Sequence, residues 1–144
     1  MNWDEIAGLS PRELDALVAK NIEGLPVVWG PDPFRVPDRR LTGHHAWVNG
    51  TSDGRSYDWE PVKRYSTDWK ATQLVIEAMY RQGWKLHLWS GISPDSSSQH
   101  NVVYQVEFSP LEGANELIFP ERGVDAPLVV VRAALWTLAQ PAKA

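Results

Sequence analysis

Hydrophobic side chains recur at helical spacing in three parts of the chain, each bounded by residues that favour helix ends. Ser10, Pro11 and Glu13 form a capping pattern before the first segment, and Gly24 supplies its stop. In the second segment Ser66 or Thr67 is the expected cap. The pattern predicts a short helix after Asn2 and longer helices over 11–23, from the 66–67 cap to Gly83, and from about 125 to 139.

Apolar and polar residues alternate in the second half of the chain, which is typical of strands with one buried face. Trp84, Leu86 and Leu88 fall on one side of the first such segment, and Trp89 falls on the other. A second alternating segment covers 101–108, and residues 116–119 form a third. We expect the first two to pair as an antiparallel hairpin, which predicts an α/β domain with a small, mainly antiparallel sheet.

The stretch between the first and second helices has weaker regular signals and is interrupted by five prolines. Residues 27–29 and 46–48 can each form a short strand, and the second leads into a turn signal at Asn49-Gly50. A connection this long without structure is unusual in a compact domain. We therefore expect one domain over 1–144 with an insertion at about 28–63, which is either folded or a functional loop.

Composition places the chain among globular proteins and limits the cellular locations and partners that we expect for it. It has 144 residues, 43% of them hydrophobic and 22% charged, no cysteine and a formal net charge of -4. The acidic start and the absence of a long apolar run predict a cytoplasmic protein that does not bind membranes. The mild acidic excess argues against contact with a nucleic acid backbone. The unusual feature of the composition is its eight tryptophans, which could belong to a core, an interface or a ligand site.

Three segments in this order resemble the phage ABA-sandwich family of small tailed-phage and prophage proteins. They are RELDALVA at 12–19 followed by Gly24, YSTD at 65–68 followed by a helix and Gly83-Trp84, and DAPL at 125–128 running into RAAL at 132–135. The resemblance implies a three-layer α-β-α sandwich and a phage origin, hence the host cytoplasm, and it implies no activity. In three layers Trp89 would be covered. The segment from Val28 to Lys63 is longer and richer in Trp, His and Arg than the family's usual link.

Motifs for catalysis, metals and phosphate loops do not occur in the sequence. His44 and His45 are adjacent, so on an extended chain they point to opposite faces, and loop histidines are favoured over a metal site. No elbow of the G-x-S-x-G kind frames a serine, and no Gly-rich phosphate loop is present. We expect no catalytic residue, no metal and no cofactor.

Cations and aromatics interleave in the insertion and continue to the start of the second helix. Aromatic faces sandwich a base while guanidinium groups take phosphates, and a helix N-terminus attracts anions. The predicted ligand-binding residues are Arg39, Arg40, His44, His45, Trp47, Trp59, Arg64, Tyr65, Ser66 and Thr67. Two alternatives stay open: an insertion that packs its aromatics into a satellite core or subunit interface, and an ordinary helix cap beside a solvated basic pair.

These observations predict a phage accessory protein that binds and sequesters a small nucleotide-derived molecule, such as a host immune signal, without catalysis. The alternative is a protein-protein inhibitor or virion-associated interaction module whose tryptophans form the contact surface. A nucleotide hydrolase acting through His44 or His45 trails both. A homo-oligomer with ligand pockets at its seam is compatible with so many aromatics.

Overall fold

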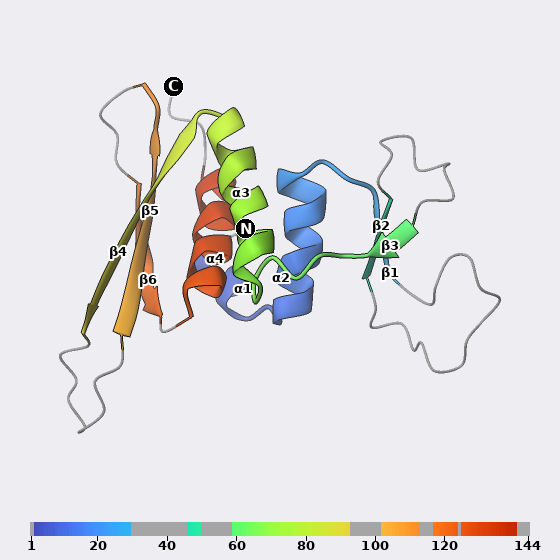
Figure 1. The fold of residues 1–144 in the computed structure, drawn as a ribbon, viewed down its shortest axis with the longest axis horizontal. Coiled ribbons are helices and arrows are strands. Elements are labelled where there is room, and N and C mark those ends of the chain that lie inside the picture. Colours follow the sequence, from blue (N-terminus) through green and yellow to red (C-terminus); the bar gives the residue numbers. More distant parts are fainter. Residues whose placement is uncertain are drawn as a thin grey trace.

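The computed structural model describes residues 2–29, 46–49, 59–92, 102–112, 117–123 and 125–140 (Figure 1). In chain order the elements are α1 (Trp3–Ala7), α2 (Pro11–Leu17), the π-helix η1 (Val18–Ile22), β1 (Val27–Trp29), β2 (Ala46–Asn49), β3 (Trp59–Pro61), α3 (Trp69–Arg81), β4 (Trp84–Ile92), β5 (Val102–Pro110), β6 (Leu117–Gly123) and α4 (Ala126–Ala139). None of the helices in these ranges combines the length and apolarity needed to cross a membrane.

The first two helices begin at the predicted caps. The side chain of Asn2 accepts a hydrogen bond from the amide of Glu5, and Ser10 does the same for Glu13, each closing a reciprocal capping box. The predicted helix over 11–23 is confirmed, although its last turn is a π-helix. Gly24 then takes a φ of +69°, which suits a residue without a side chain, and ends the helix.

The cap of α3 differs from the prediction. Asp68, and not Ser66 or Thr67, is the N-cap, and its side chain accepts a hydrogen bond from the amide of Lys70. Ser66 is fully buried and its polar groups bond to α2 instead, so it is not free to cap. Gly83, with φ of +93°, follows the end of the helix as expected.

The hairpin of β4 and β5 is confirmed, and β6 completes a three-stranded antiparallel sheet in the order β4-β5-β6. Leu86 is opposite Phe108 and Leu88 is opposite Val106, so the predicted apolar positions share one face. Val106 and Phe108 are completely buried, and α3 and α4 pack on this face of the sheet. The hydrophobic core therefore lies between the sheet and these two helices, and it continues to α1, α2 and η1, from which Ile6, Leu14 and Val18 are fully buried.

The helices of the described ranges all lie on one side of the β4-β5-β6 sheet. Figure 1 shows this sheet at one end, then α3 and α4, then α1 and α2, and the small sheet β1-β2-β3 at the other end. In the described ranges no helix covers the opposite face, and the burial of Trp89 that was expected in a three-layer sandwich is wrong, because its side chain is 49% exposed. We call the uncovered side of β4-β5-β6, which carries Trp89, the open face.

The insertion contains a sheet of its own. β1 and β2, both predicted as short strands, pair antiparallel, and β3 adds to β2. The third strand had no clear sequence signal because Pro61 lies in it. Where it is described, the insertion is therefore folded.

Candidate functional site

The predicted ligand-binding residues fall into three groups. Arg39, Arg40, His44 and His45 lie outside the described residues, so their assignment stays a prediction. Trp47 and Trp59 are in β2 and β3, where the register pairs Trp47 with Pro61 and Asn49 with Trp59. These two tryptophan positions therefore belong to one face of the small sheet. The third group, from Arg64 to Thr67, lies directly before α3.

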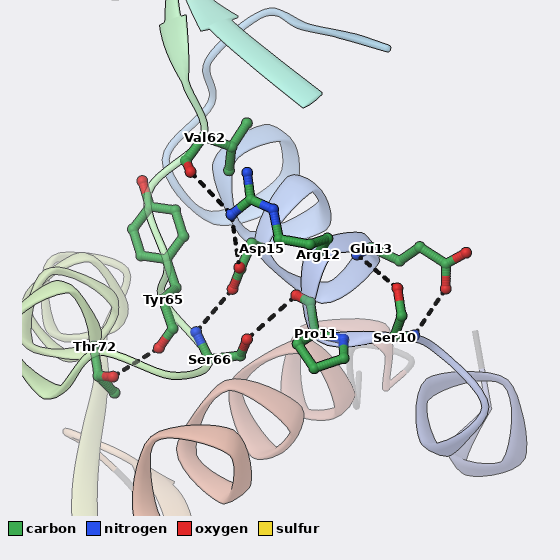
Figure 2. Close-up of polar contacts among 9 residues, drawn as sticks. All are labelled: Ser10, Pro11, Arg12, Glu13, Asp15, Val62, Tyr65, Ser66 and Thr72. Atoms are coloured by element: carbon green, nitrogen blue, oxygen red, sulfur yellow. Dashed lines mark hydrogen bonds and ion pairs between the residues drawn. The ribbon is translucent and has the colours of Figure 1, made fainter. Parts of the chain in front are cut away.

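Tyr65 and Ser66 belong to a buried polar junction between α2 and the segment that leads into α3 (Figure 2). The amide of Ser66 donates to Asp15 Oδ1 at 2.8 Å, and its hydroxyl donates to the carbonyl of Pro11 at 3.2 Å. The Thr72 hydroxyl donates to the Tyr65 carbonyl at 2.7 Å, which ties the junction to α3. An anion at the Ser66 amide would have to displace the Asp15 carboxylate.

Asp15 is the centre of this junction and is only 1% exposed. Arg12 Nη1 lies 3.1 Å from Asp15 Oδ2 and donates to the Val62 carbonyl, also at 3.1 Å. Burial raises the pKa of Asp15, although the hydrogen bonds of Ser66 and the charge of Arg12 oppose this. The carboxylate thus joins α2 to the returning end of the insertion through contacts that hold the fold.

Tyr65 is 2% exposed, and burial raises the pKa of its hydroxyl, with a further increase from the nearby acids Glu23, Asp15 and Glu60. A phenol in this setting stays protonated. Arg64 and Thr67 are exposed and are not tied into the junction by their side chains in the described part of the chain. For these two residues ligand contact stays a prediction.

A cleft of about 580 Å³ opens where four elements meet. We call it the Trp69 cleft. Its lining comes from the first residue of α3, the middle of β4, the start of β5 and the start of α4: Trp69, Leu88, Tyr104, Asp125, Ala126 and Pro127.

The chemistry of the Trp69 cleft suits a flat ring that carries polar substituents. Trp69 is 40% exposed and, with Tyr104, offers aromatic faces, while Leu88 adds an apolar surface. Asp125 is the N-cap residue of α4, but its side chain makes no capping hydrogen bond. Its carboxylate is therefore available to accept hydrogen bonds from a ligand.

Sequence reasoning missed this cleft because its lining comes from four separated segments. One signal was present: Trp69 lies outside the apolar stripe that Ala71, Val75, Ala78 and Met79 form on α3. Packing in that core does not account for a tryptophan on the outer side of the helix.

A second cleft of about 830 Å³ lies between α1, α2 and β1. Several of its polar side chains are already engaged, since Glu5, Ser10 and Glu13 form capping boxes and Arg12 bonds to Asp15. We therefore regard the Trp69 cleft as the better candidate for a ligand.

In the ranges that the structure describes, no three His, Asp or Glu side chains are grouped as a metal site would require. Comparison of the chain with family models, with curated proteins and with solved structures gives no match. The assignment of a site therefore rests on the geometry of this chain alone.

Proposed function

We propose that this chain binds a small nucleotide-derived molecule and holds it without transforming it. The observation that supports this most directly is the Trp69 cleft, in which two aromatic side chains and an uncommitted carboxylate line one cavity. Its volume of about 580 Å³ is in the usual range for small-molecule sites.

Each part of the cleft has a role in such binding. A base stacks on Trp69 or Tyr104, and Asp125 accepts hydrogen bonds from ring amino groups or sugar hydroxyls. The amides of Ala126 and Leu128 at the start of α4 receive no side-chain cap from Asp125, so they can donate to an oxygen of the ligand, whereas Pro127 between them has no amide hydrogen. Stacking on an aromatic side chain contributes about 1–3 kcal/mol per base.

The biological setting of the proposal comes from the resemblance to the phage ABA-sandwich family. A phage protein in the host cytoplasm that sequesters a nucleotide signal would blunt an immune response that uses this signal. Such a protein needs affinity and abundance and no turnover. The cationic and aromatic residues of the insertion, Arg39 to Trp59, would then supply a second binding region.

The test is a titration of the purified chain with cyclic dinucleotides and ADP-ribose derivatives, followed by tryptophan fluorescence and melting temperature. A ligand that binds the folded state quenches fluorescence and raises the melting temperature. Trp69→Ala should weaken binding by about 5- to 150-fold, the equivalent of one lost stack. Trp89→Ala is the matched control, since Trp89 is exposed on the other side of the sheet and should leave affinity unchanged.

The outcomes separate the parts of the proposal. Recovery of intact ligand by chromatography supports sequestration, whereas a chemical product contradicts it. Binding that survives Trp69→Ala but is lost when Trp47 and Trp59 are replaced moves the site to the insertion. No response to any of these ligands contradicts the proposed ligand class.

A second candidate function is protein-protein inhibition, and the open face favours it. His87 and Trp89 stack there with ring centroids 5.9 Å apart, and Trp89 is 49% exposed. A docked protein would cover the exposed Trp89 and would supply the missing layer of the proposed α-β-α sandwich. Co-purification of a defined host protein that Trp89→Lys abolishes would support this function.

A further inference from the structure

The β4-β5-β6 sheet has two edges, and they differ in how well they are protected. On the β6 edge, Pro120 removes an amide donor, and the register of β6 on β5 shifts between Gln105 and Glu107. Proline and irregularity are two ways in which proteins prevent edge strands from pairing with other chains.

β4 has neither protection. Its pairing with β5 is regular over all nine residues from Trp84 to Ile92, and it contains no proline. No strand in the described ranges pairs with its outer side. Lys85 is its one charged residue apart from histidine. A long, regular and weakly charged edge of this kind is a template for another strand.

The hydrogen-bond pattern shows which residues of β4 face outward. The amide of Leu111 donates to the Gly83 carbonyl at 2.9 Å, which extends the register that pairs Trp84 with Pro110. In an antiparallel pair the residues that bond to the partner strand alternate with those that do not. Since position 83 bonds toward β5, the groups that face the free edge belong to Trp84, Leu86, Leu88, Ser90 and Ile92.

We propose that β4 pairs antiparallel with β4 of a second copy of this chain, about a two-fold axis at Leu88. The two sheets then form one continuous sheet of six strands. This register pairs Leu88 with itself, Leu86 with Ser90, and Trp84 with Ile92, so every outward group of the strand meets an outward group of the copy. It is also the two-fold register that overlaps β4 over its whole length.

The side chains of β4 are self-complementary in this register. On the open face, His87 lies opposite Trp89 of the partner subunit, an aromatic cross-strand pair. On the helix face the two Leu88 side chains meet, which covers a leucine that is 38% exposed in the single chain. Lys85 lies opposite Gly91 of the partner subunit, so the axis brings no two like charges together.

This dimer goes beyond the proposed function and does not depend on it, because it follows from the strand edge alone. The proposed dimer and the proposed ligand site share one residue, Leu88, which lies on the two-fold axis and lines the Trp69 cleft. The axis therefore places the clefts of both copies beside the seam.

A pair of single-cysteine variants tests the register, because the natural chain has no cysteine. Across the axis the two Leu88 Cα atoms would be about 5.5 Å apart, within reach of a disulfide. The two Lys85 positions would be separated by about 20 Å along the strand. Under mild oxidation Leu88→Cys should form a covalent dimer, whereas Lys85→Cys, the matched control, should stay monomeric on a denaturing gel.

Light scattering of the unmodified chain over a concentration series measures the association itself, and Ser90 offers a second matched pair. Ser90→Pro deletes an outward amide but no bond to β5, and should raise the dimer dissociation constant at least about tenfold. Ser90→Ala keeps the amide and should remain dimeric. A chain that is monomeric throughout, equal cross-linking at both cysteine positions, or a folded Ser90→Pro variant that is still fully dimeric would each overturn the proposal. If Ser90→Pro does not fold, the cysteine pair decides.

Discussion

Replacing Asp15 with alanine should destabilise the fold more than any other change at the junction in Figure 2. The substitution removes the acceptor of the Ser66 amide, which lies on a completely buried residue. A buried donor left without a partner costs about 1–3 kcal/mol. Arg12 also loses its ion pair, but its side chain is 36% exposed and water compensates for most of that loss. We expect Asp15→Ala to lower the free energy of unfolding by about 3 kcal/mol.

Asp15→Asn is the control because it keeps an oxygen for the Ser66 amide and removes the charge. Its cost at neutral pH should be about 1 kcal/mol. Burial raises the pKa of Asp15 above its ordinary 3.8, so the folded state binds a proton more readily than the unfolded state. The stability that this provides is complete below the ordinary pKa and is lost as pH rises through the raised pKa. The free energy of unfolding of Asp15→Asn should therefore fall further below that of the natural chain as the pH is lowered from neutral toward 4.

Urea denaturation followed by circular dichroism, at several pH values, measures both effects. Equal costs for the alanine and asparagine variants would show that the Ser66 hydrogen bond is not what the carboxyl group contributes. If the stability difference between Asp15→Asn and the natural chain becomes smaller toward acid pH, the folded state favours the charged carboxylate of Asp15 instead.

Two further changes address the packing of the sheet and the buried phenol. Gly123→Ala places a Cβ 2.5 Å from Cγ2 of the buried Val129, so urea denaturation should show a loss of about 1–3 kcal/mol, and Val129→Ala in the same chain should recover part of it. Because burial raises the pKa of Tyr65, the natural chain should lose stability above pH of about 10, where the unfolded tyrosine ionises first. Tyr65→Phe should reduce that loss in alkaline melts, and an unchanged alkaline profile would contradict the burial of the hydroxyl.

The features that local sequence decides were predictable. The capping boxes at Asn2 and Ser10 involve residues three positions apart, so the pattern contains all the information that they need. The β4-β5 hairpin was equally readable, because the alternation of each strand fixes which side chains share a face. The length and order of the helices followed from the same kind of signal.

The predictions that proved wrong concern residues whose surroundings depend on contacts between distant segments. Ser66 looks like a cap until Asp15, fifty-one positions earlier, takes its amide. Trp89 looks like a core residue until the helices are seen to occupy only the other face. Glu107, on the polar side of its strand, proves to be 5% exposed. In each case the local pattern permits both outcomes and the tertiary arrangement selects one.

The candidate site could not be predicted from the sequence for the same reason, because it is formed by contacts between distant segments. Trp69 and Tyr104 are in different elements, and no short motif connects them with Asp125. Residue types alone directed attention to the insertion, where cations and aromatics are close in sequence. The cleft became visible only when the packing of α3 and α4 on the sheet brought distant residues together.

The junction at Asp15 connects the two regions that could hold a ligand. Arg12 fixes the Val62 carbonyl at the returning end of the insertion, and Asp15 fixes Ser66 three residues before Trp69. A ligand that draws the insertion toward itself would pull on the same few hydrogen bonds that orient the start of α3. Loosening them by Asp15→Ala should therefore weaken binding in the Trp69 cleft even though Asp15 does not line it. If affinity is unchanged in a folded Asp15→Ala chain, the cleft is positioned by the sheet and α4 alone.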